Sequence, residues 1–321
     1  MDDAAPTRLP PGGQNAIAVA LGLLGDEWTL LILRYALQGV RRYQDWHDRL
    51  PISNAVLTAR LTRLTDMGLL VRDAYQQRPV RYAYQLTPRG REIWPVLVSI
   101  WGWEYRWVDA HSERLPWMRH RGCGRHMEPV MVCGGCEQPV RPREVSSVLG
   151  PSGAAGRSIP SGATRRRSAA GAESGAGLFP ETMSLIGNRW SVGLLGAAFL
   201  GAHRFGEFQQ RLGAPPAMIA DRLRTFCALG VLEALPGEPG RGSYRLTAKG
   251  RAFFPVVMTL IDWGQHWFLA PEGPALLSTH LGCGADFAPR LVCDGCRQVL
   301  CDSDVQVIGE EPAAPVPVRA R

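Results

Sequence analysis

Apolar residues recur at helical spacing near the start of the chain. One face of residues 16–24 is apolar, and residues 28–37 are apolar almost all round. The first pattern predicts an amphipathic helix and the second a buried one. Gly39 then ends the second helix.

The next two segments have the pattern of a helix-turn-helix. Residues 42–49 predict a short helix that breaks at Leu50-Pro51, because proline excludes helical geometry from its predecessor. Ser53 is a favourable N-cap for a helix that runs to about Met67, with leucines at 57, 61 and 64 on one face. A short helix, a tight turn and an amphipathic helix are the parts of this motif.

Two extended segments and a long helix complete the unit. Residues 70–75 and 80–86 predict a hairpin, which after a helix-turn-helix forms a wing. A helix is predicted from about Pro88 to Ala110, and it carries more aromatic residues than one small domain can cover. A thick core is one explanation. We favour the other, a helix that pairs with a second unit.

The chain contains this unit twice. Gly25-Asp26-Glu27-Trp28 aligns with Gly187-Asn188-Arg189-Trp190 at an offset of 162 residues, and Thr87 aligns with Thr247 at an offset of 160. Agreement on both sides of one two-residue deletion indicates a tandem duplication. We call residues 14–145 copy one and residues 178–305 copy two.

The repeat sets the predicted domains and the fold class. Each copy has a winged helix-turn-helix (14–112 and 178–272) followed by a small cysteine-containing appendage (113–145 and 273–305). Residues 146–177 are dominated by Gly, Ala, Ser, Pro and Arg, which predicts a flexible linker, and residues 306–321 are predicted to be a disordered tail. The fold class is mainly α with small β wings (α+β).

Charge and composition narrow the class of protein. Of the net charge of +7, residues 1–150 carry +4 (19 basic and 15 acidic residues), whereas residues 178–321 carry zero (13 of each). The basic first half favours an anionic partner. No apolar run reaches the length of a membrane span, and the N-terminus lacks the pattern of a secretion signal. We therefore expect a cytoplasmic protein without a membrane partner.

The two appendages share one spacing of histidine and cysteine. His120, Cys123, Cys133 and Cys136 in copy one match His280, Cys283, Cys293 and Cys296 in copy two. Four ligands in two close pairs suit tetrahedral zinc and leave no open position for catalysis. We predict two structural zinc ions per chain, one in each appendage. Disulfides are the alternative, which the duplicated histidine and a reducing compartment oppose.

One stretch resembles a known family. Residues 20–34, which include Gly25-Asp26-Glu27-Trp28, resemble the opening signature of the HxlR-type winged-helix transcription regulators. The similarity covers about residues 15–110 and, more weakly, 177–270. It implies a dimer, made by terminal helices, that reads operator DNA. Many relatives sense oxidants with a cysteine thirteen residues before the signature tryptophan. Asn15 and Gly177 stand at that position, so this mechanism is not expected.

The second helix of the motif is expected to enter the major groove of double-stranded DNA. Its outward side chains are polar in copy one, and arginines flank it and lie on the wing. The candidate DNA contacts of copy one are Arg41, Arg42, Ser53, Asn54, Thr58, Arg60, Arg63, Arg78 and Arg81. A solvated surface charge is the alternative for any single arginine, but their clustering on one motif favours DNA.

Copy two is poorer in such groups. Its helix begins with Pro215-Pro216-Ala217 and carries Asp221, which leaves Arg222 and Arg224 as candidate contacts. We therefore predict a sequence-specific transcription regulator that reads DNA mainly with the first winged helix. A zinc-stabilised protein-interaction scaffold with degenerate winged helices is the alternative. The residues show no arrangement typical of an enzyme.

The aromatic terminal helices allow two assemblies. They can pair within the chain, which gives a pseudo-dimer, or between chains, which gives a homodimer with four winged helices. The segment between the copies is long enough for pairing within the chain. We favour the pseudo-dimer.

Overall fold

The winged helix-turn-helix of copy one has the predicted order of elements. This computed structural model describes residues 5–109, 111, 115–160, 179–237 and 242–308. Helices α1 (Ala16–Leu24) and α2 (Glu27–Leu37) come first, followed by α3 (Tyr43–Arg49) and α4 (Asn54–Asp66) of the motif. The wing consists of β2 (Leu70–Gln77) and β3 (Val80–Leu86), which pair antiparallel.

The helix expected over residues 88–110 is interrupted. It forms α5 (Pro88–Arg91) and α6 (Trp94–Trp107), with a break at Glu92 and Ile93. Pro95 lacks an amide hydrogen and its ring would clash with the carbonyl one turn earlier, so a continuous helix through it is unfavourable. The break places Pro95 in the first turn of α6, where proline is tolerated.

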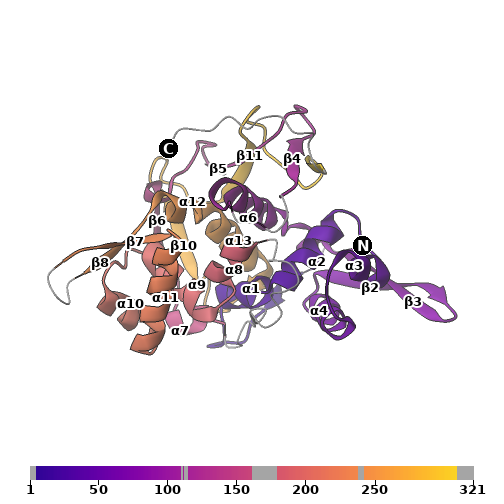
Figure 1. The fold of residues 1–321 in the computed structure, drawn as a ribbon, viewed down its shortest axis with the longest axis horizontal. Helices are drawn as coiled ribbons and strands as arrows, with labels where there is room; N and C mark the ends of the chain where they lie inside the picture. The colour runs from indigo at the N-terminus through magenta and orange to yellow at the C-terminus, as the bar shows by residue number, and fades with distance from the viewer. Residues whose placement is uncertain (1–4, 110, 112–114, 161–178, 238–241, 309–321) are drawn as a thin grey trace.

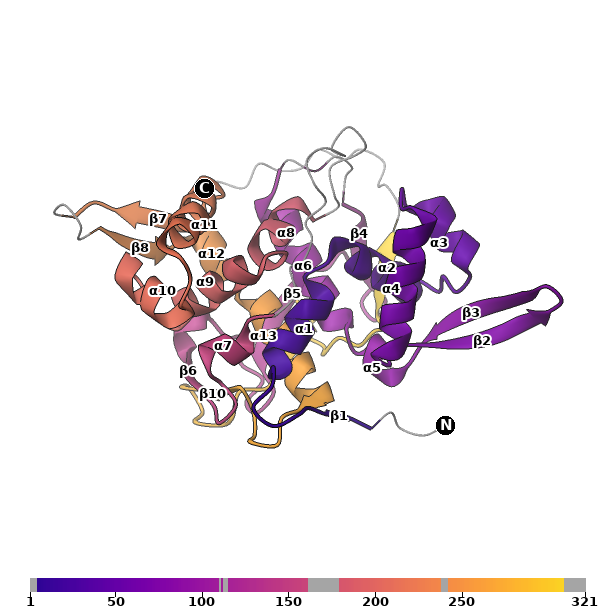
Figure 2. The same ribbon diagram turned by 90° about the horizontal axis from the view of Figure 1, so that it is seen from below.

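Copy two repeats this order, including the break before a proline in its last helix. Its helices are α8 (Pro180–Ile186), α9 (Arg189–Phe199), α10 (Phe205–Leu212), α11 (Pro216–Ala228), α12 (Ala248–Ala252) and α13 (Phe254–Trp267). Its wing consists of β7 (Leu232–Leu235) and β8 (Ser243–Leu246), and residues 238–241 lie outside the described part. In Figure 2 the wings of the two copies point outward at opposite ends of the molecule.

The predicted linker and the predicted tail both begin too early in the sequence, because each starts with residues that form regular structure. Strand β6 (Val145–Leu149) and the short helix α7 (Ala155–Ser158) lie within the segment assigned to a flexible linker. Ser152 Oγ donates to the carbonyl of Gly273 at 2.8 Å, and Asn15 Nδ2 donates to the carbonyl of Ser152 at 2.9 Å. Backbone pairing and these contacts hold Val145–Leu149 and Ser152 in place despite the composition of the surrounding sequence. Strand β12 (Val305–Ile308) likewise occupies the start of the predicted tail. Residues 161–178 and 309–321 lie outside the described part.

The two appendages exchange strands rather than folding separately. Copy one contributes β4 (Trp117–His120), β5 (Pro129–Cys133), the turn η1 (Pro142–Glu144) and β6, and copy two contributes β10 (Leu276–His280), β11 (Pro289–Cys293) and β12. Each sheet here joins one strand from each copy: β4 with β12, β5 with β11, and β6 with β10.

The register of this exchange has a pseudo-two-fold relationship. His120 lies opposite Val305, and their repeat equivalents, His280 and Val145, also lie opposite each other. The central pair β5 and β11 is symmetric about Met131 and Leu291, which face each other. The two copies therefore pair with each other as two identical subunits would.

The aromatic helices meet inside the chain. Helix α13 packs against α1 and α6, and all three lie in the middle of the molecule in Figure 1. The Trp103 ring meets Phe253 edge-on with 4.8 Å between centroids, and Trp103 Nε1 donates to the carbonyl of Lys249 at 3.0 Å. Trp263 Nε1 donates to the carbonyl of Arg89, also at 3.0 Å. The aromatic side chains on the terminal helix of each copy are therefore covered by the other copy, as the pairing hypothesis predicted.

The segment that precedes copy one also pairs with copy two. Strand β1 (Thr7–Arg8) runs parallel to β9 (Phe268–Leu269).

Among the described residues, no single helix is long and apolar enough to cross a membrane. Only α1 and α2 together reach that length and composition, and they are bent by 82°.

Candidate nucleic-acid interface and metal centres

The outward face of α4 is polar and is organised by a residue that the sequence interpretation missed. Asn54 and Thr58 are exposed, whereas Leu57 and Leu61 are fully buried on the opposite face. The hydroxyl of Tyr43 lies 3.0 Å from both Asn54 Oδ1 and the Asn54 carbonyl oxygen, and 3.3 Å from Thr58 Oγ1. Tyr43 therefore fixes the first turn of the helix and the Asn54 side chain. A comparison of the two copies in the sequence could have pointed to Tyr43, since copy two has Phe205, which lacks the hydroxyl, at the equivalent position.

Arg60 belongs to an internal ion pair. Its Nε and Nη2 donate to the two carboxylate oxygens of Asp26 at 2.7 and 2.8 Å, and the Asp26 side chain is only 7% exposed. The hydrogen bond to Asp26 raises the pKa of Arg60. Asp26 also caps α2 by accepting from the backbone N–H of Thr29. The structure thus places Arg60 between α4 and α2, whereas the sequence suggested a DNA contact at the border of the outward face.

The other arginines predicted in copy one fall into three groups. Arg63 Nη2 donates to the carbonyl of Gly22 at 2.7 Å, so its side chain turns toward α1. Arg42 lies over the ring of Tyr75 on the wing, 5.1 Å from its centroid. Arg78 and Arg81 are exposed near the wing turn, and Arg41 is exposed two residues before the start of α3. Ser53 is the N-cap of α4, where its side chain accepts from Val56.

Helix α11 of copy two has a different charge arrangement. Arg222 makes a close ion pair with Asp221, and Arg224 Nη2 lies 3.7 Å from the same carboxylate. The hydrogen bond from Arg222 lowers the pKa of Asp221. Asn188 stands where copy one has Asp26, so Arg222 has no carboxylate there to pair with. Both arginines of α11 therefore share one acid on their own helix.

The eight predicted metal ligands form two clusters, each made from both copies. His120 and Cys123 meet Cys293 and Cys296, while Cys133 and Cys136 meet His280 and Cys283. In each cluster the ligand atoms all lie within 4.8 Å of one another. The ligand residues are those predicted, but their grouping was wrong, because a site had been assigned to each appendage. Strand exchange brings the first pair of one copy to the second pair of the other.

The distances within the clusters fit a tetrahedral ion. Cys123 Sγ lies 3.9 Å from Cys293 Sγ, and Cys133 Sγ lies 3.9 Å from Cys283 Sγ. A zinc–sulfur bond of about 2.3 Å implies about 3.8 Å between sulfurs in a tetrahedron. Each histidine turns Nδ1 inward, 3.2 Å from Cys296 Sγ for His120 and 3.2 Å from Cys283 Sγ for His280.

The surroundings of the first cluster favour a bound cation. His120 and Cys293 are buried, at 1% and 0% exposure. A backbone hydrogen bond from Arg125 lowers the pKa of the Cys123 thiol to about 7, whereas burial raises the pKa of Cys293 to about 11. Several thiolates become stable together in such a place only beside a divalent ion. Gly122 leaves room for the imidazole, since a Cβ there would lie 2.8 Å from His120 Cε1.

Both winged helices match one sequence family. The model of the HxlR-like helix-turn-helix family matches residues 23–112 and 185–271. The chain belongs to the HxlR-like helix-turn-helix family. This assignment confirms the predicted tandem, DNA-binding transcription regulator of HxlR type, and it confirms that the protein is not an enzyme.

Individual relatives of this HxlR-like chain have similar names. It is 36% identical over 125 residues to the uncharacterized HTH-type transcriptional regulator MT3179 of Mycobacterium tuberculosis, covering 38% of this chain and 79% of the relative. It is 41% identical over 91 residues to the uncharacterized HTH-type transcriptional regulator sll1512 of Synechocystis, covering 28% and 67%. The crystal structure of PA1607, a proposed transcription factor, is 37% identical, with a TM-score of 0.36, and the match covers 40% of this chain and 91% of PA1607.

Proposed function

We propose that this HxlR-like protein is a sequence-specific transcription regulator whose first winged helix reads most of the operator. The observation that carries the proposal is the Tyr43–Asn54 arrangement at the start of α4. Asparagine can donate to and accept from adenine in the major groove, and a side chain held in place loses less entropy on binding. Copy two has Phe205 and Pro216 at the equivalent positions, so it can form no such contact.

Charge supports the same asymmetry. The two arginines of α11 are paired with Asp221, which lowers their attraction for phosphate. Arg78 and Arg81 extend from the longer wing of copy one. In this arrangement α11 adds contacts to the phosphate backbone of the DNA, and α4 distinguishes the bases of the operator.

The metal is zinc and its role is structural. Three cysteines and one histidine fill a tetrahedral shell, which leaves no position for a reactive water. Each ion would also bind the two copies to each other, because its ligands come from both. Zinc would therefore hold the two appendages together at the ends of the exchanged strands.

A gel-shift assay with genomic fragments from beside the gene tests the DNA-reading role. The full chain, loaded with zinc, should retard one of these fragments in the presence of excess unrelated DNA. A variant carrying Asn54→Ala and Thr58→Ala should lose this discrimination while keeping its two metal ions. Absence of any selective retardation would instead favour the protein-interaction scaffold.

A further inference from the structure

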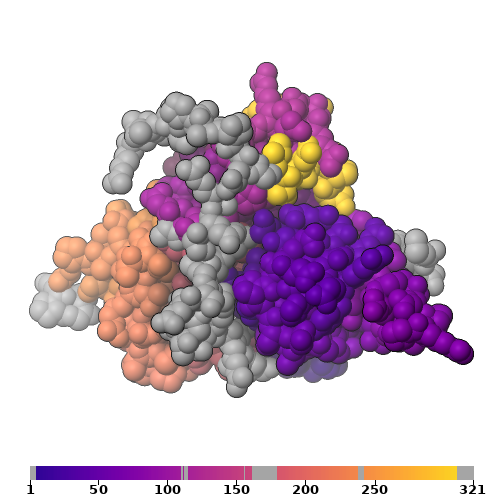
Figure 3. Space-filling model, turned by 45° about the vertical axis from the view of Figure 1, so that its right-hand side comes forward, coloured from indigo at the N-terminus to yellow at the C-terminus, as the bar shows by residue number. Residues whose placement is uncertain are grey.

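A cavity of about 690 Å³ lies where three parts of the chain meet. Its walls are the end of α2 with the following turn, the end of β3, and the segment of copy two around β12, together with Arg91 and Arg121. The volume is within the usual range for small-molecule sites, about 300–1,000 Å³. In Figure 3 the yellow C-terminal segment lies directly against the indigo first winged helix.

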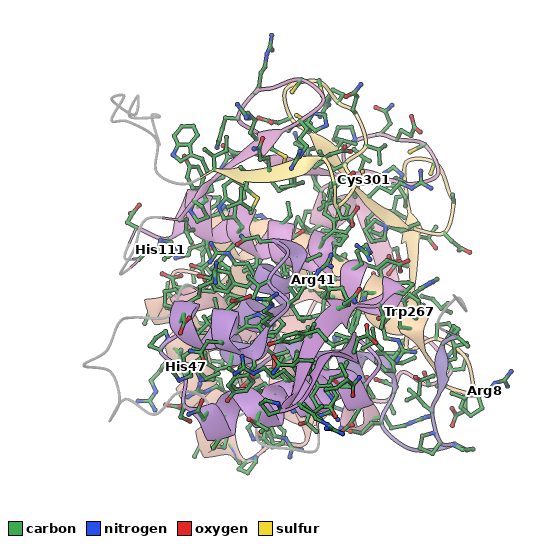
Figure 4. All side chains as sticks on the ribbon, turned by 90° about the vertical axis from the view of Figure 1, so that its right-hand side faces the viewer. Arg8, Arg41, His47, His111, Trp267 and Cys301 are labelled. Carbon is green, nitrogen blue, oxygen red and sulfur yellow. The ribbon has the colours of Figure 1, made fainter. Side chains whose placement is uncertain are left out.

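Three arginines are among the residues that line this cavity. They are Arg41 before α3, Arg91 in α5 and Arg121 in the first appendage, and the one acidic residue in the lining is Asp302. Among the described residues, the ion pairs involve none of these three arginines. Figure 4 shows Arg41 near the middle of this side of the molecule, with Cys301 above it.

Copy two does not have an equivalent set of charges. His203 stands in place of Arg41 and lies 3.2 Å from Glu207 Oε2, and Leu281 stands in place of Arg121. Arg251 remains in place of Arg91, but it donates to the carbonyl of Leu246. A cavity lined by three arginines that form no ion pair is therefore a feature of copy one alone within the described part of the chain.

We propose that this cavity binds a small molecule with two or more anionic oxygen groups, carboxylate or phosphate. A guanidinium presents paired donors that match either group, and three of them suit a multivalent anion. A bound anion would contact both the turn that leads into α3 and the β12 segment of copy two. It would thus join the first winged helix to the metal-bearing appendages.

The position of the cavity favours a small ligand over the DNA backbone. Two of its walls come from the appendage side, at Arg121 and at Asp302, Ser303 and residues 305–307. Neither α4 nor the tip of the wing, which carry most of the candidate DNA contacts, contributes a residue to the lining. This inference assigns Arg41 to the cavity, although the sequence suggested a DNA contact.

Calorimetric titration of the zinc-loaded full chain, without DNA, tests the proposal. The probes are trimesate, a rigid aromatic tricarboxylate that chelates zinc poorly, and inorganic phosphate. The test variant Arg41→His with Arg121→Leu gives the cavity the residues of copy two, and Arg251→Ala is the matched control in copy two. Zinc content and circular dichroism should be equal in all three proteins.

We expect saturable binding of at least one probe, with one site per chain. The test variant should bind about tenfold more weakly or worse, since it loses two charge-assisted hydrogen-bonding groups, and the control should bind as the wild type does. The preferred probe identifies the anionic group as carboxylate or phosphate. Equal binding by the test variant, or no saturable binding of either probe, would overturn the proposal. Neither result bears on DNA binding, which is measured separately.

Discussion

The hydroxyl of Tyr43 lies 3.0 Å from Asn54 Oδ1 and connects the two helices of the first helix-turn-helix motif. The same hydroxyl reaches the backbone carbonyl of Asn54 at 3.0 Å. Phe205 and Pro216 occupy these two positions in copy two, so the second motif has neither the hydroxyl nor the amide. The difference lies on the face that would meet DNA.

Asn54→Ala should weaken operator binding by about 1–3 kcal/mol, the usual cost of a lost base contact. Tyr43→Phe should cause a smaller loss of the same kind, because it removes the hydrogen bond but leaves Asn54 in place. Fluorescence anisotropy with a labelled operator measures both effects. Arg224→Ala is the control in copy two and should change affinity little. Equal losses in Asn54→Ala and Arg224→Ala would show that both copies read DNA alike.

Asp26→Asn should lower the thermal unfolding midpoint of the protein. It removes the carboxylate that holds Arg60 and leaves a partly buried guanidinium unpaired, at a cost of about 1–3 kcal/mol. The reverse change in copy two, Asn188→Asp, places a carboxylate beside Arg222 and should not destabilise. Differential scanning calorimetry compares the two, and a matching loss in both variants would contradict the role assigned to this pair.

Zinc stoichiometry tests the grouping of the ligands. His120→Ala with Cys123→Ser should lose one ion, and Cys293→Ser with Cys296→Ser should lose the same ion, so the four changes together still leave one. Combining His120→Ala and Cys123→Ser with Cys133→Ser and Cys136→Ser should instead remove both ions. Elemental analysis of the purified proteins gives the counts. The opposite pattern would place each ion within a single appendage.

Light scattering at micromolar concentration should give a mass close to the 35.2 kDa of one chain. The surfaces that could join two chains are already used within one: Trp103 and Trp263 are 3% and 4% exposed, and the described strands of the appendages are paired across the copies. A stable mass of twice this value would show that the copies exchange between chains instead.

Much of the local structure could be predicted because it depends on local signals. The break at Leu50-Pro51, the N-cap at Ser53 and the leucines on one face of α4 are enough to place the helix-turn-helix. The aromatic excess of the terminal helix also correctly indicated a partner. These signals act over one or two helical turns, and the sequence displays them directly.

The ligand grouping could not be predicted in the same way. The spacing from His120 to Cys136 is equally compatible with one closed site and with two half-sites, since each close pair forms its own turn. The choice depends on whether β5 pairs within its copy or with β11, which is a contact across about half the chain. The linker boundary was missed for a related reason, because β6 leads into a segment of loop-like composition and is stabilised by pairing with the distant β10.

Strand exchange also has a consequence for how the protein is made. On the ribosome, β5 emerges long before β11, with about 160 residues between them. At a synthesis rate of about 5–20 residues per second, the first appendage waits roughly 8–30 s for its partner strand. During that interval it carries unpaired strand edges and two half-complete thiol sites, so nascent copy one would need protection from other chains until copy two is complete.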